Sequence, residues 1–223
     1  AKTVKRVSLE LGGKSAHIVC EGVDLNAVIP NAINQCFINS GQSCSAPTRL
    51  LIPEVSINNI KNIIVDHVKT LIFNNPNDVN TTHGPVVNQK QYNTIQEFIK
   101  SGIDEGYEIV TGGLGNPDNC NSGYFIRPTV FINVDNSATI AQEEIFGPVL
   151  SIISYSSIDN AIDIANNSKY GLSNYITCLD YDDGYNIAKR IHSGQSIINK
   201  IGRGSVPAPF GGFKLSGNGR EHG

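Results

Sequence analysis

Apolar residues follow two different spacings along this chain. Short unbroken apolar runs indicate buried strands, and apolar positions three or four residues apart indicate one face of a helix. The runs predict strands over residues 15–20, 49–52, 107–110, 126–134, 149–155, 176–179 and 196–199. Helical spacing occurs in five groups: Ile29, Ile33, Cys36 and Phe37; Ile57, Ile60, Ile64, Val68 and Leu71; Tyr92, Ile95, Ile99 and Ile103; Ile158, Ala161, Ile162 and Ala165; Ala188 and Ile191.

Residues that begin or interrupt helices refine this pattern. Asp24 precedes the first helical group and Ser56 precedes the second, and both side chains can cap a helix N-terminus. Pro30 lies inside the first group, so we expect it near the first turn or at a kink. The acids that follow Asp180 have the wrong spacing for a calcium loop, and this residue is expected to cap the next helix. The Asn-, Asp- and Gly-rich stretch 112–123 predicts a loop.

Strands that alternate with helices of this length predict βαβ units and a parallel sheet. The fold class expected is therefore α/β, with a mainly parallel sheet and flanking helices. The sequence contains no internal repeat, low-complexity tract or linker, so residues 1–223 are expected to form one domain.

Composition narrows the range of functions. The 223 residues carry 17 Lys and Arg against 20 Asp and Glu, for a formal net charge of −3. This balance argues against nucleic-acid binding by phosphate neutralisation and against a polybasic membrane-surface protein. No apolar run approaches the roughly 18 residues needed to span a bilayer. Five cysteines, odd in number and widely spread, are typical of a reducing compartment, so we expect a cytoplasmic protein. The absence of any Met predicts that the chain is an excerpt of a longer polypeptide.

One cysteine stands among small residues. Cys44 follows a glycine-containing break after a predicted helix, and its small neighbours leave room for a substrate to approach the sulfur. The break could place Cys44 at a following helix terminus, where backbone N–H groups lower a thiol pKa toward neutral. The alternative is a small buried hydrophobic residue, which is the favoured interpretation for Cys20 and Cys36.

Acids near glycines are the next candidates. Glu10 lies between two leucines before Gly12-Gly13, and apolar surroundings would raise its pKa toward that of a base at neutral pH. Glu144 and Phe146 lie before a Gly-Pro turn, where an acid could accept from a ribose hydroxyl and an aromatic ring could pack on a flat ligand. Read in isolation, each acid is better interpreted as a solvated charge, and the phenylalanine as a core residue.

Glycines and aromatics are interleaved near the end of the chain. Phe210 lies in the glycine-rich segment 209–221, which predicts either a loop whose backbone closely approaches a ligand or a surface turn. The five histidines form neither an H-E-x-x-H motif nor an i, i+4 pair, so no metal site is expected.

In this order the four segments resemble the aldehyde dehydrogenase superfamily, and the resemblance covers essentially the whole chain. The motifs are Glu-Leu-Gly-Gly-Lys at 10–14, Gly-Gln-Ser-Cys at 41–44, Glu-Glu-Ile-Phe-Gly-Pro-Val at 143–149 and Pro-Phe-Gly-Gly-Phe-Lys-x-Ser-Gly at 209–217. The resemblance implies an open, mainly parallel α/β catalytic domain and oxidation of an aldehyde to a carboxylate.

The resemblance also assigns roles to matching residues. Cys44 would attack a small aldehyde to form a thiohemiacetal and then, after hydride loss, a thioester. Glu10 would be the general base for the water that hydrolyses this thioester, which favours water over coenzyme A as the acyl acceptor. Glu144, Phe146 and Gln91 would contact the nicotinamide cofactor.

Further matches imply supporting roles and a missing part. Phe210 would line the substrate tunnel, and Lys14 and Asn199 match supportive positions. The resemblance further implies that an N-terminal domain absent from this chain binds most of the NAD or NADP. It also implies that the full-length protein is a homo-oligomer and that this excerpt alone is inactive as a dehydrogenase.

Two other classes of function stay open. A cysteine-dependent esterase or acyltransferase would pair Cys44 with a histidine, but no histidine motif supports this. A non-catalytic paralogue would keep the fold for structure or assembly. Slight support for the paralogue comes from the basic, glycine-rich stretch 199–206, where family members often carry an aromatic or acidic residue.

Overall fold

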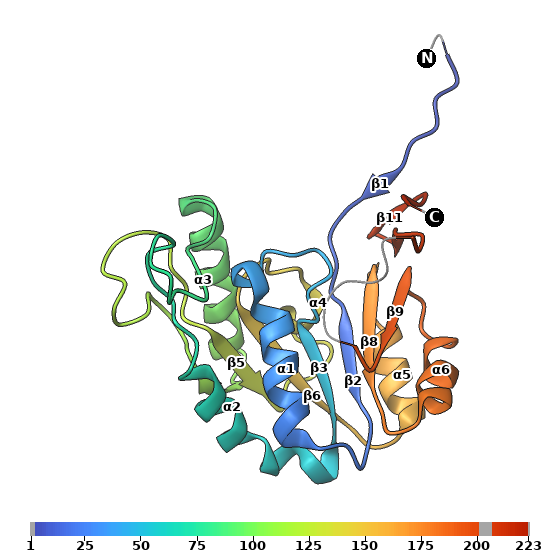
Figure 1. Cartoon of the computed structure of the whole chain (residues 1–223), viewed down its shortest axis with the longest axis horizontal. Helices are drawn as coiled ribbons and strands as arrows, with labels where there is room; N and C mark the ends of the chain where they lie inside the picture. The colour runs from blue at the N-terminus through green and yellow to red at the C-terminus, as the bar shows by residue number, and fades with distance from the viewer. Residues whose placement is uncertain (1–2, 201–206, 223) are drawn as a thin grey trace.

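A seven-stranded sheet forms the centre of the computed structural model, which describes residues 3–200 and 207–222 (Figure 1). In spatial order the strands are β4 (Glu108–Thr111), β5 (Thr129–Ile132), β6 (Val149–Tyr155), β3 (Arg49–Pro53), β2 (Ala16–Val19), β8 (Ser173–Thr177) and β9 (Gln195–Ile198). All neighbouring pairs are parallel except β4 and β5, which are antiparallel. The predicted α/β class is confirmed.

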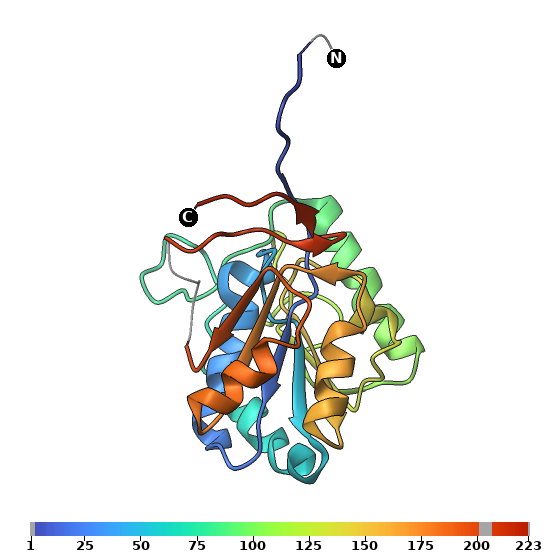
Figure 2. The same ribbon diagram turned by 90° about the vertical axis from the view of Figure 1, so that its right-hand side faces the viewer.

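Helices cover both faces of this sheet. Helices α1 (Leu25–Phe37) and α2 (Lys61–Val68) bury their apolar stripes on one face, against Leu50, Leu150 and Ile152. The other face carries α3 (Gln89–Asp104), α4 (Thr139–Gln142), α5 (Ile158–Asn166) and α6 (Tyr181–Ala188). Figure 2 shows α1 and α5 on opposite sides of the sheet. Strands buried on both faces explain why their sequences are continuous apolar runs.

Shorter elements connect these layers. They are the 3₁₀ helices η1 (Ile38–Gly41) and η2 (Glu54–Asn59), and the strands β1 (Leu9–Glu10), β7 (Tyr170–Gly171), β10 (Phe213–Lys214) and β11 (Gly217–Asn218). Strand β1 pairs with β11, and β10 pairs with β7, so the end of the described chain is tied back to its beginning and to the middle of the fold. Within the described ranges, no helix is long and apolar enough to cross a membrane.

Two predicted caps are confirmed and one is wrong. The side chains of Asp24 and Asp180 accept from the backbone N–H groups two residues later, at the starts of α1 and α6. Ser56 does not cap a helix, because the residues that leave β3 wind as η2 and place this serine in its interior. Helix α2 begins only at Lys61, without a side-chain cap, so the apolar stripe that was predicted as one helix spans two elements. Pro30 lies inside α1, in its second turn.

Two predicted strands have different boundaries in the structure. The run 126–134 contains only the four residues of β5, because Pro128 lacks an amide donor and Asn133 adopts a positive φ of 55°. Strand β8 begins three residues before the predicted 176–179, at Ser173, and ends at Thr177. Its buried Asn174 donates to Ser193 Oγ, Gln195 O and Ser196 Oγ, so partners distant in sequence make polar residues acceptable in a central strand.

A buried arginine at the start of β3 forms hydrogen bonds with three other segments of the chain. Arg49 is 2% exposed and begins β3. Its Nε donates to Lys14 O at 3.0 Å, and its Nη atoms donate to Asn136 Oδ1, Ile164 O and Ala165 O at 2.9–3.0 Å. Burial lowers the pKa of this guanidinium to about 10, so it still carries its charge at neutral pH. The charge is accommodated because three carbonyls and an amide surround it.

We predict that Arg49→Ala lowers the free energy of unfolding by about 3 kcal/mol or more, because it leaves buried carbonyls without donors. Urea denaturation followed by far-UV circular dichroism measures the change. The matched control is Arg190→Ala, which removes an exposed arginine paired with Asp159 and is expected to cost less than about 1 kcal/mol. Equal urea midpoints for the two variants would show that the Arg49 network contributes no special stability.

Candidate functional site

The candidate residues gather at one edge of the sheet. Residues 12–14 lead into β2, Cys44 precedes β3, residues 144–147 precede β6, and Leu172 precedes β8. Because these strands are parallel, their amino ends lie along the same edge, which is the edge beside β1 and β11 in Figure 1. Segments separated by more than a hundred residues in sequence therefore meet in one place.

Two glycines allow this meeting. A β-carbon at Gly12 would lie 2.1 Å from Glu144 Oε2, and one at Gly13 would lie 2.3 Å from the backbone oxygen of Cys44. The backbone N–H of Gly13 donates to Glu144 Oε1 at 3.0 Å. The Gly-Gly pair therefore lets an acid and the thiol-bearing turn contact the same short stretch of backbone.

Cys44 lies half-buried in the turn between η1 and β3. The expectation of a helix terminus at this thiol is wrong, because the chain passes from the turn directly into β3. Burial raises the pKa of Cys44 above its ordinary value, and the negative charges of Glu144 and Glu10 raise it further. The backbone N–H groups of Cys44 and Ser45 act in the opposite direction. The resting thiol is therefore protonated rather than activated.

Contacts from four directions hold the turn that carries Cys44. Gly41 packs so closely on the loop before β6 that a β-carbon there would lie 2.1 Å from Gly147 O. Gln42 donates to Asn39 O and accepts from Val87 N. On the other side, Tyr175 Oη of β8 donates to Ser45 O at 3.0 Å. These contacts fix the backbone of the turn that carries Cys44.

Glu10 belongs to β1 and faces the glycine-rich end of the chain. Both carboxylate oxygens are buried and form no hydrogen bond among the described residues. Burial raises the pKa of Glu10, the nearby Glu221 raises it further, and Arg220 lowers it. A β-carbon at Gly211 would lie 2.9 Å from Glu10 Oε1. The predicted rise in pKa is confirmed, and the free oxygens are available to accept a proton.

The loop before β6 is held by a glutamine. Gln91 Nε2 donates to Ile145 O at 2.9 Å and to Phe146 O at 3.0 Å. Phe146 is half-buried and has a positive φ of 54°. Burial raises the pKa of Glu144, whereas the Gly13 N–H and the charge of Lys14 lower it. The side chain of Gln91 thus contacts the loop that carries Glu144 and Phe146.

Phe210 lies in the C-terminal segment, next to Gly211, which closely approaches Glu10. Its backbone forms an antiparallel bridge with Glu221, with N···O distances of 2.7 and 2.8 Å. Its side chain is half-buried. The link to the cluster runs through Glu221, whose charge acts on Glu10. Most of the basic stretch 199–206 lies outside the described residues.

Sequence reasoning does not find every residue that shapes this edge. The sequence indicates Lys14 only as a supportive position, yet this lysine is 2% exposed and its Nζ has no hydrogen-bond partner among the described residues. Burial and the charge of Arg49 lower its pKa to about 7. Arg49 and Tyr175 carry no motif, and the only signal of the arginine is a charge that opens an apolar run. In the part of the chain that the structure covers, no group of three or more His, Cys, Asp and Glu side chains could hold a metal ion.

Known proteins are similar to this chain in sequence and in fold. The model of the aldehyde dehydrogenase family matches residues 1–223. A putative aldehyde dehydrogenase of Staphylococcus haemolyticus is 45% identical over 223 residues, which are 100% of this chain and 47% of the relative. A putative aldehyde dehydrogenase of Staphylococcus saprophyticus is 44% identical over the same proportions. The chain therefore spans about half the length of the curated relatives it matches.

Solved structures agree. Aldehyde dehydrogenase C from Pseudomonas syringae, an alanine mutant in complex with NAD⁺ and octanal, has a TM-score of 0.95 and 41% identity over 99% of this chain and 45% of that one. An aldehyde dehydrogenase from Mycobacterium tuberculosis in complex with NAD⁺ has a TM-score of 0.93 and 44% identity over 97% of this chain and 44% of that one.

We predict that iodoacetamide alkylates Cys44 about tenfold faster for each unit of pH between 7 and 9, because the raised pKa keeps the thiolate a minor species throughout this range. Glu144→Gln removes a negative charge that opposes the thiolate, so it should increase the rate at pH 8 by about two- to tenfold. Mass spectrometry of the Cys44 peptide measures the rate.

Glu143→Gln is the matched control, because Glu143 is paired with Lys169 and does not act on Cys44. A plateau in the alkylation rate below pH 8 would contradict the raised pKa. An identical increase in the control variant would contradict a specific effect of Glu144.

Proposed function

Because this chain belongs to the aldehyde dehydrogenase family, we propose that its candidate site oxidises an aldehyde to a carboxylate, with Cys44 as the nucleophile. The observation that carries the proposal is the convergence of Cys44, Glu10 and Glu144 at one edge of the sheet, where both carboxylates act on the thiol. We also propose that residues 1–223 are the catalytic part of a longer, cytoplasmic, self-associating enzyme.

A nicotinamide cofactor, NAD or NADP, fits one part of this edge. Glu144 and Phe146 offer a carboxylate and an aromatic ring, both half-buried, on a loop that Gln91 holds in place. These two side chains would hold the ribose and the flat ring at the nicotinamide end, and a separate domain would bind the rest. NAD⁺ is present in two of the similar solved structures. When bound, the cofactor supplies a hydride acceptor.

The first step requires that Cys44 lose its proton and that its sulfur be positioned for attack. The backbone N–H groups of Cys44 and Ser45 favour the charged sulfur, while burial and the two acids oppose it. Once formed, the thiolate attacks the carbonyl carbon of the aldehyde and a thiohemiacetal results. Loss of hydride from that carbon leaves a thioester on Cys44. The contacts of Gln42 and Tyr175 keep the turn that carries Cys44 in place through both steps.

The second task is hydrolysis, which we assign to Glu10. Its raised pKa makes the carboxylate a stronger base than an ordinary glutamate, and its two oxygens have no other partner in the described structure. Glu10 takes a proton from a water molecule, and the resulting hydroxide attacks the thioester carbon. The carboxylate product leaves, and Cys44 departs as a thiolate that recovers its proton.

No observation favours a cysteine–histidine hydrolase. His17 Nε2 forms a hydrogen bond with Thr177 Oγ1, and His83 Nδ1 forms one with Thr82 Oγ1, each at 2.8 Å. Among the described residues, no histidine shares a hydrogen bond with Cys44. A non-catalytic paralogue is the remaining alternative, and it is separated from the proposed enzyme by the variants below.

We predict different failures for Cys44→Ala and Glu10→Gln in the polypeptide that contains this chain together with a cofactor-binding domain. Cys44→Ala should form no NAD(P)H from an aldehyde. Glu10→Gln should give one rapid burst of NAD(P)H per site and then turn over about 10²- to 10⁴-fold more slowly, because the thioester persists. Stopped-flow absorbance measures the burst, and mass spectrometry locates the acyl group on Cys44. Aldehyde oxidation that survives Cys44→Ala would refute the proposal.

We predict a separate result for residues 1–223 alone. This chain should reduce neither NAD nor NADP at any aldehyde concentration, because most of the cofactor would be bound by another domain. Cys44 should nevertheless react with iodoacetamide. Absorbance at the nicotinamide band measures the reduction, and appearance of NADH with the purified chain would contradict the proposed division of labour.

A further inference from the structure

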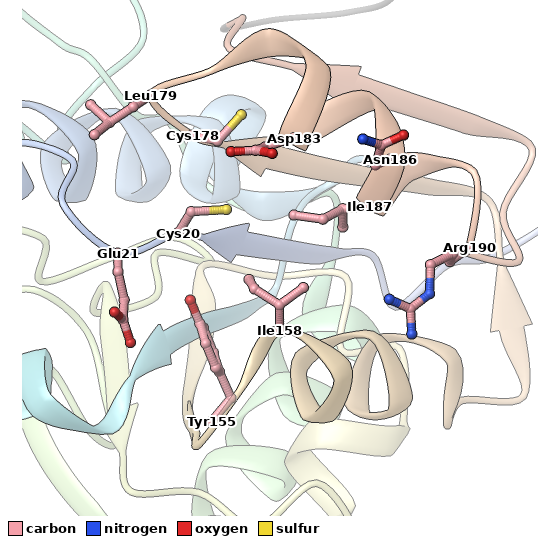
Figure 3. Close-up of a pocket in the computed structure, with 10 residues that line it drawn as sticks. All are labelled: Cys20, Glu21, Tyr155, Ile158, Cys178, Leu179, Asp183, Asn186, Ile187 and Arg190. Carbon is pink, nitrogen blue, oxygen red and sulfur yellow. The ribbon is translucent and has the colours of Figure 1, made fainter.

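A cavity opens at the opposite edge of the sheet from the candidate site, at the carboxyl ends of the parallel strands. It has a volume of about 540 Å³ and is bordered by the residues that follow β2 and β8, by the end of β6, by the start of α5, and by α6 and the residues just after it (Figure 3). None of the residues to which we assign a catalytic or cofactor role borders it. The cavity therefore belongs to neither step of the proposed reaction.

The course of the chain explains why a crevice exists here. From β2 the chain passes into α1 on one face of the sheet, and from β8 it passes into α6 on the other face. Because β2 and β8 are neighbours, their connections diverge and leave an opening between them. Such switch points at the carboxyl ends of strands are where open α/β sheets commonly admit small molecules.

Two cysteines on neighbouring chain segments line this crevice. The parallel register pairs Ile18 with Ile176 and Val19 with Thr177, and Cys20 N donates to Thr177 O at 2.8 Å. One step further along the same register places Cys20 opposite Cys178. Both cysteines follow the paired isoleucines by two residues, so both side chains point to the same face.

This placement suits a disulfide. Adjacent strands lie about 4.8 Å apart, and disulfides join Cα atoms that are about 4.4–6.8 Å apart. The two cysteines are near enough for Cys178 to raise the pKa of the Cys20 thiol. Figure 3 shows both side chains among the residues that line the cavity. Cys20 is half-buried, whereas Cys178 is 7% exposed and its Sγ donates to Asp180 O at 2.9 Å.

We propose that Cys20 and Cys178 form a dithiol that a small disulfide, such as glutathione disulfide, oxidises to an intramolecular disulfide. Cys20, the more exposed thiol, loses its proton and attacks one sulfur of the small disulfide, and one glutathione leaves as a thiolate. Cys178 then loses its proton and attacks the Cys20 sulfur of the mixed disulfide, and the second glutathione leaves. The protein thiols are oxidised, and one disulfide is reduced to two thiols.

The surroundings of the pair make this exchange slow at neutral pH. Burial raises the pKa of Cys20 to about 12, and the charges of Cys178 and Asp183 contribute. The rate should therefore rise about tenfold per pH unit between pH 7 and 9. The other titratable and charged groups bordering the cavity are Glu21, Tyr155, whose Oη donates to Val19 O, and Arg190, which is paired with Asp159.

The test uses the full chain with Cys44→Ala, so that the candidate nucleophile does not react. After incubation with glutathione disulfide at pH 8.5, intact mass spectrometry should show the loss of two hydrogen atoms. Peptide mapping without reduction should find Cys20 linked to Cys178. With Cys178→Ser added, the protein should instead gain one glutathione on Cys20, because the second exchange cannot occur.

Cys120→Ser in the same background is the matched control, because Cys120 is buried elsewhere and its Sγ donates to Phe73 O. This control should still form the Cys20–Cys178 disulfide. The proposal is overturned if the unaltered pair stays reduced, or keeps only a mixed disulfide, under conditions in which Cys44 of the parent chain is modified. A disulfide that involves any other pair of cysteines overturns it as well.

Discussion

Two positions without side chains hold the candidate site together. At Gly12 and Gly13 the backbone passes so close to Glu144 and to the carbonyl of Cys44 that a single β-carbon would collide with either. A third close approach, between Gly41 and Gly147, brings the thiol-bearing turn against the loop that carries the acid. The chemistry at this edge depends on these approaches, because groups from three loops must share a few ångströms of space.

The close packing of these loops also shifts the pKa values of the thiol and the two carboxylates. Removing a thiol or a carboxylate from water favours its neutral form, and each of the acids near Cys44 makes the thiolate less favourable. Glu10 and Glu144 have raised pKa values for the same reason. Beside them, Arg49 keeps a buried positive charge among carbonyls and anchors Lys14 O. The site therefore combines a protonated thiol with two carboxylates whose basicity is increased.

The two edges of the sheet have different chemical character, although they share strands. The amino ends of β2 and β8 frame Cys44, and Leu172 at the start of β8 packs beside Gly13. The carboxyl ends of the same strands carry Cys20 and Cys178 over a separate cavity. The two sites are therefore separated by the length of these strands, whose side chains are buried on both faces of the sheet.

Local patterns in the sequence were sufficient to predict those strands and helices whose signal lies within a few residues. The apolar run of β6, the stripe of α3 and the cap at Asp24 agree with the structure, and the four motifs name the residues that converge. Only the tertiary structure decided the direction of the pKa shift at Cys44, the contact of Gln91 with the loop carbonyls, and the opposition of Cys20 and Cys178. Periodicity and capping depend on neighbours along the chain, whereas burial, charge and strand register depend on residues that only folding brings together.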